Sequence, residues 1–120
     1  MFALGVNGNA DPYANFGRTV VYDYYIRSFP KHRYIISTVG GTGSISGAYS
    51  NSNVVKFNAL LRQKYANSSS VALYDCYEFL KDSKLLYPGK NNKGTKDGLH
   101  YKSKVYKALL KDLREFVEEI

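Results

Sequence analysis

The chain is poor in the residues that stabilise small proteins covalently or bind structural metals. It has one cysteine, Cys76, and two histidines among 120 residues. An internal disulfide is therefore excluded, and no cysteine or histidine spacing predicts a zinc site, so we expect neither a metal nor another cofactor. Without a disulfide pattern, the cellular compartment stays open.

Long apolar runs are also absent. None approaches the roughly 18 residues that a transmembrane helix needs, so no membrane span is expected. Met1 is not followed by a charged leader and an apolar segment, which predicts a cytoplasmic location by default, or secretion if an N-terminal part is missing. With 44% hydrophobic residues, residues 1–120 are expected to form a single globular domain that buries roughly two-thirds of its unfolded surface.

Acidic residues are few: ten stand against 17 lysines and arginines, which gives a net charge of +7. A basic chain raises the question of a nucleic-acid partner. Nine of the basic residues are lysines between Lys81 and Lys111, however, and they follow one loop and one helix. Lysines spread in this way are typical of a solvated surface, and no nucleic-acid-binding module is present. We therefore expect no nucleic-acid partner.

Hydrophobic periodicity predicts strands and helices in alternation. Short apolar runs predict strands at residues 2–4, 34–39 and 71–74. Apolar residues spaced by three and four predict helices over residues 14–29, although residues 19–26 are also rich in strand-forming residues, and from about 51 to 67, with Asn51, Ser52 or Asn53 as the cap. A short helix is expected at residues 77–82. The last helix carries an apolar stripe that consists of Val105, Leu109, Leu113, Phe116 and Ile120.

Long crossovers between successive strands imply a parallel sheet with helices on its faces. We expect a three-layer α/β/α, flavodoxin-like fold that is partial, with about three parallel strands. Functional residues in such sheets lie beyond the carboxyl ends of the strands. Two loops meet this condition: Gly5-Val6-Asn7 follows the first strand, and Asp97-Gly98-Leu99-His100 precedes the last helix.

These two loops resemble conserved blocks of the SGNH (GDSL-type) hydrolase family. Gly5-Val6-Asn7 resembles its Gly-x-Asn block, and Asp97-Gly98-Leu99-His100 resembles its Asp-x-x-His block. The order of strands and helices is similar to that family from its third strand to its end. The resemblance covers essentially all 120 residues and implies that the chain is similar to the carboxyl-terminal half of such a hydrolase.

The resemblance implies a role for each matching residue. His100 would act as general base toward a serine hydroxyl, and Asp97 would orient its imidazole. Asn7, with the Gly5 loop that carries it, would bind the substrate oxyanion, where one donor is typically worth about 3 kcal/mol in the transition state. The implied reaction is hydrolysis of acyl or acetyl esters of carbohydrates or lipids, with a small ester or an acylated carbohydrate as substrate.

The sequence departs from the family at two points. Gly8 stands where the family usually has an aspartate, and no Gly-Asp-Ser nucleophile block occurs in the chain. Ser44 and Ser46 lie in a glycine-flanked loop, but neither has glycines on both sides at the spacing of a nucleophile elbow. Since loss of the serine costs about six orders of magnitude in turnover in another hydrolase, we expect a truncated esterase that is inactive as an isolated chain.

Two other functions stay open. The chain could be a non-catalytic binding or assembly module that pairs through its exposed edge strand, as a homodimer or by domain swapping. Alternatively, the loop from Gly40 to Gly43 could bind a phosphate or nucleotide through backbone amides, although it matches neither glycine-rich fingerprint.

Each candidate residue also has a purely structural interpretation. His100 could bond the backbone at a helix start, Asp97 could form a turn with the following glycine, and Asn7 could be a turn residue. Asp75, at the end of a strand, is a weaker site candidate and is expected to cap the helix that follows it. His32 lies between basic residues after Pro30, which predicts a surface position.

Overall fold

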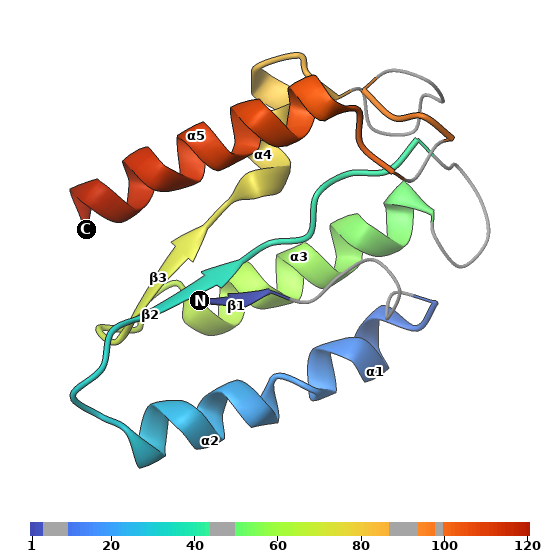
Figure 1. Ribbon diagram of the computed structural model, residues 1–120. Helices are drawn as coiled ribbons and strands as arrows, with labels where there is room; N and C mark the ends of the chain where they lie inside the picture. The colour runs from blue at the N-terminus through green and yellow to red at the C-terminus, as the bar shows by residue number, and fades with distance from the viewer. Residues whose placement is uncertain (4–9, 44–49, 87–93, 98–99) are drawn as a thin grey trace.

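The computed structural model describes residues 1–3, 10–43, 50–86, 94–97 and 100–120. Strands and helices alternate along the described residues, which confirms an α/β protein (Figure 1). The strands are β1 (Phe2–Ala3), β2 (Tyr34–Ser37) and β3 (Val71–Tyr74). The helices are α1 (Pro12–Gly17), α2 (Val20–Ser28), α3 (Asn51–Tyr65), α4 (Cys76–Asp82) and α5 (Ser103–Glu119).

The three strands form a parallel sheet in the order β1-β2-β3. β2 and β3 pair along their whole length, from Tyr34 opposite Val71 to Ser37 opposite Tyr74. The short β1 joins at the other edge of β2, with Phe2 opposite Ile36. Because all pairs are parallel, the carboxyl ends of the strands lie at one end of the sheet (Figure 1). The predicted parallel arrangement is thus confirmed.

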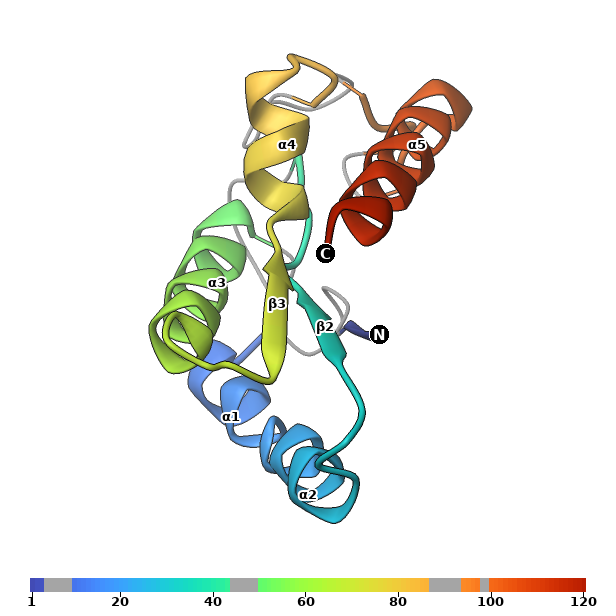
Figure 2. The ribbon, with the colours of Figure 1, turned by 90° about the vertical axis from the view of Figure 1, so that its left-hand side faces the viewer.

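Helices lie on both sides of the β2–β3 pair (Figure 2). α3 packs on one side, and α5 lies on the other. The contact with α5 is made by Tyr74 at the end of β3, whose hydroxyl donates to a carboxylate oxygen of Asp112 at 2.8 Å and whose ring lies 5.2 Å from that of Phe116. Burial and this hydrogen bond raise the pKa of Tyr74, so its hydroxyl stays a donor at neutral pH.

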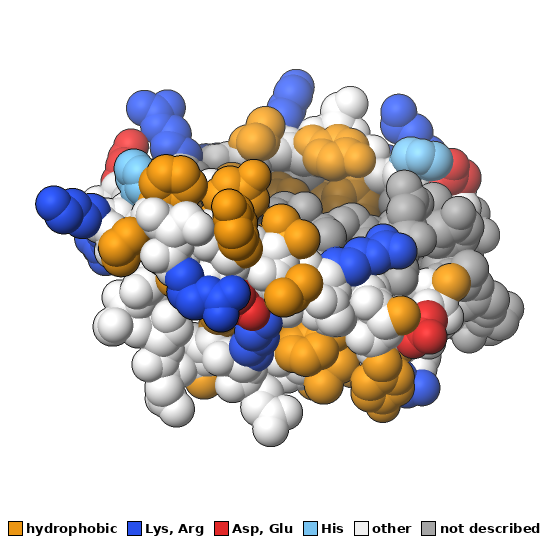
Figure 3. All heavy atoms as spheres, turned by 90° about the horizontal axis from the view of Figure 1, so that it is seen from below, with side chains coloured by type: hydrophobic (Ala, Val, Ile, Leu, Met, Phe, Trp, Pro, Cys, Tyr) orange, Lys and Arg blue, Asp and Glu red, His pale blue; other side chains and the backbone are white. Residues whose placement is uncertain are grey.

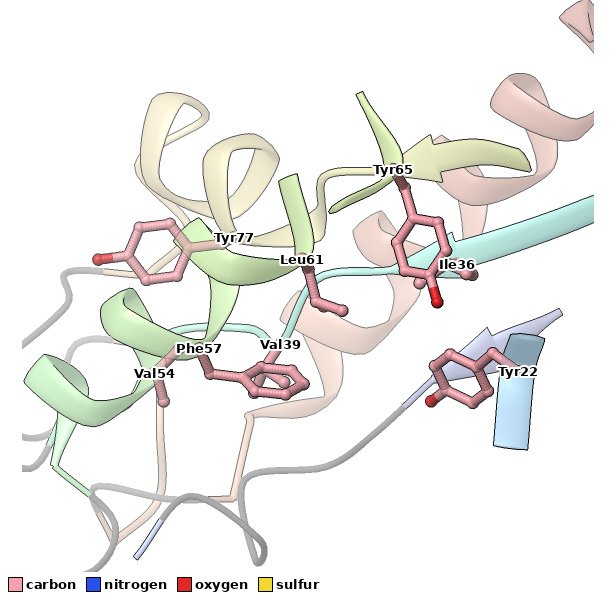
Figure 4. Packing of buried hydrophobic residues seen from close by; sticks show 8 residues of the cluster. All are labelled: Tyr22, Ile36, Val39, Val54, Phe57, Leu61, Tyr65 and Tyr77. Atoms are coloured by element: carbon pink, nitrogen blue, oxygen red, sulfur yellow. The ribbon is translucent and has the colours of Figure 1, made fainter. Parts of the chain in front are cut away.

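The main hydrophobic core lies between α3 and the sheet (Figure 4). α3 directs one face inward, and this face packs against Ile36 and Val39 of the β2 segment and against Tyr22 of α2. The buried residues that α3 supplies to this core are Val54, Phe57, Leu61 and Tyr65. A second, smaller cluster joins α4 to α5 through Leu80, Leu86 and Val105.

The predicted helix over residues 14–29 is divided into α1 and α2. Polar contacts lie at the junction of the two helices. Thr19 Oγ1 donates to the Phe16 carbonyl, and Lys64 of α3 donates to both Thr19 Oγ1 and Asp23 at 2.7 Å. These contacts set the rotation of α2 so that Tyr22 is buried. The apolar residues that suggested the helix are therefore largely exposed, namely Val20, Val21, Tyr24, Tyr25 and Phe29.

The α3 cap and the burial along α5 differ from what the sequence suggested. The α3 cap is Ser50, whose Oγ accepts from the Asn53 amide at 3.3 Å, and not one of the three residues that follow it. Along α5, burial falls off from Val105, which is fully buried, to Ile120, which is exposed. The predicted stripe is present, but only its first residue reaches a closed core.

Candidate active site

Asp97 and His100 make a two-point contact just before α5. A carboxylate oxygen of Asp97 lies 2.7 Å from His100 Nδ1, and the other accepts from the His100 backbone amide at 2.8 Å. Both side chains are largely exposed, at 54% for Asp97 and 67% for His100. The predicted pair is thus brought together, at a position that solvent reaches freely.

This geometry defines the tautomer of the neutral imidazole. An ionised carboxylate only accepts hydrogen bonds, so Nδ1 of His100 carries the proton in the contact with Asp97. Nε2 is then the ring nitrogen that can accept a proton from a nucleophile or a water molecule. In general-base catalysis, a carboxylate orients the imidazole of the base in this way.

The loop that carries the pair is closed at its base by backbone bonds. Thr95 and Tyr101 form an antiparallel bridge, and the Lys96 amide donates to the His100 carbonyl at 2.8 Å. Gly94, at the start of the loop, has φ of +93°, and a Cβ there would lie 2.2 Å from the Leu85 carbonyl oxygen. Only glycine fits both the backbone angle and the close approach.

Tyr101 connects this loop to the segment that follows β2. Its hydroxyl donates to the Gly41 carbonyl oxygen at 2.8 Å, across 60 residues of sequence. In Figure 1 the orange segment around residue 100 accordingly lies beside the segment that leaves β2. The Asp97–His100 pair is therefore located at the carboxyl end of the sheet, as predicted for a functional loop. Sequence reasoning overlooked Tyr101, which was one of twelve tyrosines.

Two asparagines of α3 hold the segment after β2 in place. Asn58 is fully buried, accepts from the Val39 amide and donates to the Val39 carbonyl, both at 2.8 Å. Asn51 accepts from the Thr42 amide at 3.1 Å and donates to the Tyr77 hydroxyl at 3.0 Å. From the sequence, Asn51 was proposed only as a helix cap, and Asn58 was not singled out.

Asp75 caps α4, as predicted, by accepting from the Glu78 amide at 3.2 Å. It also accepts from Thr38 at 3.0 Å and from the Arg62 guanidinium at 2.7 and 3.0 Å. Burial opposes its ionisation, but the Arg62, Glu78 and Thr38 hydrogen bonds prevail and lower the pKa of Asp75. These contacts join β2, α3 and α4, which is a structural role.

Cys76 follows Asp75 and is buried. Its Sγ donates to the Thr38 carbonyl oxygen at 2.9 Å, and burial raises the pKa of the thiol. A buried thiol with a raised pKa forms little thiolate at neutral pH, so it is a poor nucleophile.

Of the remaining candidate residues, some lie outside the part of the chain that the structure describes. Gly5, Asn7, Ser44 and Ser46 lie outside the described residues. In the Gly40 to Gly43 segment, the Thr42 amide is already bonded to Asn51, and the Gly41 carbonyl to Tyr101. Phosphate binding there stays a prediction. His32 is exposed, as expected.

No cluster of three or more metal-ligating side chains occurs among the described residues. Within the same ranges, every helix is too short or too polar to cross a bilayer. Comparison of the chain with protein-family models, curated proteins and solved structures finds no match. The family resemblance therefore depends on the residues of the sequence alone.

Proposed function

We propose that the chain carries the acid–base half of an SGNH-type serine esterase site. The observation that supports this most strongly is the contact of Asp97 with His100, which leaves Nε2 oriented as a base at the carboxyl end of a parallel sheet. In this proposal His100 takes the proton of a serine hydroxyl as the serine attacks an ester carbonyl. Asp97 stabilises the imidazolium that forms.

The nucleophile is assigned to polypeptide outside these 120 residues, because they contain no Gly-Asp-Ser block. Asn7 and Gly5, which follow β1 in the sequence, would supply the oxyanion site in this proposal. The finer fold that belongs to this proposal is a flavodoxin-like three-layer sandwich, of which the described strands would be three neighbouring members. Acetyl or other acyl esters of carbohydrates or lipids are the proposed substrates.

Small acyl esters test the first part of this proposal. The isolated chain should hydrolyse p-nitrophenyl acetate at most slightly faster than its His100→Ala variant, because the imidazole has only water to activate in place of a serine. Asn67→Ala, a surface change between α3 and β3, serves as the control for purification and folding. An esterase rate that is lost in His100→Ala and in Asp97→Asn but kept in the control would reveal a nucleophile inside the chain.

The coding DNA upstream of Met1 tests the second part. A Gly-Asp-Ser segment preceded by a strand-forming apolar run, in any frame, supports the proposal. The polypeptide restored by joining that segment should hydrolyse acetyl esters, and His100→Ala should lower its turnover by several orders of magnitude. Absence of such a segment, together with no ester turnover, would remove the esterase assignment.

A second function is favoured by the edge of the sheet. Within the described residues β1 is an edge strand, and both α2 and α5 carry exposed hydrophobic side chains. The face over α1 and α2 in Figure 3 shows hydrophobic side chains among lysine and arginine side chains. Exposed apolar surface and an unpaired strand edge each favour association. We propose a second copy of the chain as the partner, which makes the protein an assembly module.

Light scattering across ionic strength tests this pairing. Two chains of net charge +7 repel each other, so salt should strengthen a dimer formed by apolar contact and backbone pairing. Leu110→Lys on α5, at a side chain 64% exposed, should weaken that dimer. Val55→Lys on α3, on the other side of the sheet, is the matched control. A monomer at high concentration and high salt would exclude the assembly function.

A further inference from the structure

The Asp97–His100 pair is not held in place by burial. Both side chains are more than half exposed, and their mutual hydrogen bonds span only three residues. A local contact of this kind between exposed groups opens when the loop that carries it changes conformation, and it does not fix the pair to the sheet. Another residue has to fix the pair relative to the strand ends, where a substrate would bind.

Tyr101 is placed to do this. It follows His100 directly, and its hydroxyl donates to the Gly41 carbonyl at 2.8 Å, while its backbone pairs with Thr95 at the base of the loop. Its ring lies 5.5 Å from that of Tyr106 on the first turn of α5. Burial raises the pKa of Tyr101, so its hydroxyl remains protonated and able to donate over the whole neutral range.

Gly40 makes room for this contact. A Cβ at position 40 would lie 2.0 Å from the Tyr101 hydroxyl oxygen and 3.0 Å from the ring carbon that bears it. Any other residue there would displace Tyr101 or the segment after β2. The glycine that suggested a phosphate-binding loop in the sequence is thus explained by a tyrosine on a distant loop.

We propose that Tyr101 is a positioning residue that fixes the Asp97–His100 pair to the carboxyl end of β2, and that Gly40 is glycine in order to accept it. This inference rests on the proposed esterase site for its functional meaning. The positioning itself is a property of the isolated chain and is measurable without any substrate. Asn58 and Asn51 complete the connection by holding Val39 and Thr42 on either side of the two glycines.

Nitrogen-15 NMR of the two histidines provides the test. At about pH 8.5, where histidine is ordinarily neutral, long-range proton–nitrogen correlations distinguish imidazole protonated at Nδ1 from imidazole protonated at Nε2. In the wild-type chain, His100 should show the Nδ1-protonated pattern that its contact with Asp97 requires. His32 has no carboxylate partner among the described residues and serves as an internal reference.

Tyr101→Phe removes the hydroxyl and keeps the ring. We expect His100 to lose the Nδ1-protonated pattern and to move toward the mixed pattern of His32, because the freed loop samples conformations without the Asp97 contact. Tyr106→Phe, a matched tyrosine on α5 whose side chain is largely exposed, should leave His100 unchanged. A folded Tyr101→Phe chain with an unchanged His100 pattern would overturn the proposal.

Gly40→Ala tests the same contact from the other side. It should perturb the His100 pattern as Tyr101→Phe does, whereas Gly17→Ala, where a Cβ meets nothing within 4 Å, should not. The two changes should also be non-additive, since Tyr101→Phe removes the atom that the new Cβ approaches most closely. Additive effects on unfolding would show that the two residues do not share one contact.

These outcomes separate the two proposals. A His100 pattern that depends on Tyr101 supports positioning even if no esterase activity is ever restored. Esterase activity in a restored polypeptide, with a His100 pattern and turnover that ignore Tyr101→Phe, would support the esterase site and refute the positioning role.

Discussion

Replacement of Asn58 by aspartate tests how the segment after β2 is held. The Asn58 side chain is fully buried and pairs with both backbone groups of Val39, accepting from the amide and donating to the carbonyl. Aspartate has the same shape. Its carboxyl group keeps an acceptor for the Val39 amide but, when ionised, has no donor for the carbonyl.

The expected cost follows from these two bonds. A buried polar group without its partner costs about 1–3 kcal/mol, so Asn58→Ala, which leaves two such groups, should destabilise the chain by about 2–6 kcal/mol. That is a large share of the roughly 5–15 kcal/mol that stabilises a typical domain. At neutral pH, Asn58→Asp should be at least as harmful, because it adds an unpaired charge in the core.

The two variants should differ in their pH dependence. Burial raises the folded-state pKa of the introduced carboxyl group above its unfolded value of about 3.9. Its protonated form donates to the Val39 carbonyl and restores both bonds, so stability is retained at low pH and is lost as pH rises toward the folded pKa. Between the two pKa values, the loss is about 1.4 kcal/mol per pH unit.

Urea unfolding followed by circular dichroism measures this difference. The destabilisation by Asn58→Asp relative to wild type should be smaller at about pH 4.5 than at about pH 7.5, by about 2–4 kcal/mol. Asn67→Asp, at an exposed site after α3, should show no comparable change. Equal destabilisation by Asn58→Asp at the two pH values, or a cost of Asn58→Ala below about 1 kcal/mol, would refute the two-bond explanation.

Two further predictions concern other parts of the structure. Gly94→Ala should destabilise the chain by about 1–3 kcal/mol, because φ of +93° and the 2.2 Å approach to Leu85 both oppose a side chain, whereas Gly17→Ala should be neutral or slightly stabilising in thermal melts. Asp75→Asn keeps the helix cap but loses the Arg62 charge contact. Since the pKa of Asp75 is lowered in the folded state, the wild type should be more stable than this variant above about pH 4. The difference should vanish as the pH falls further, which unfolding measured across an acid titration tests. A difference that stays constant with pH would contradict this.

Local pattern was sufficient for much of the fold. The β3 strand from Val71 to Tyr74 was predicted with its observed bounds, because a short apolar run between polar segments has few alternatives. The presence of α5 and the inward position of Val105 followed from a strong helical periodicity. The pairing of Asp97 with His100 was equally predictable, since a spacing of three residues makes the contact local.

Predictions that depended on distant contacts were less successful. The rotation of α2 is set by the contacts of Thr19 and Asp23 with Lys64, which lies more than 40 residues away. The apolar residues of α2 therefore do not mark the face that the helix buries. Asn58 and Tyr101 were missed for the same reason. Their partners are backbone groups of Val39 and Gly41, and a backbone group leaves no signature in a sequence.

The buried thiol of Cys76 can report how often β2 and α4 separate. Because Sγ lies against the Thr38 carbonyl between β2 and α4, a thiol reagent reaches it only in molecules in which these elements have separated. At low reagent concentration, the labelling rate therefore gives the population of opened molecules. At high reagent concentration, it gives the rate at which they open. With a single cysteine in the chain, a disulfide-linked dimer formed in an oxidising solution would likewise count the molecules that had opened.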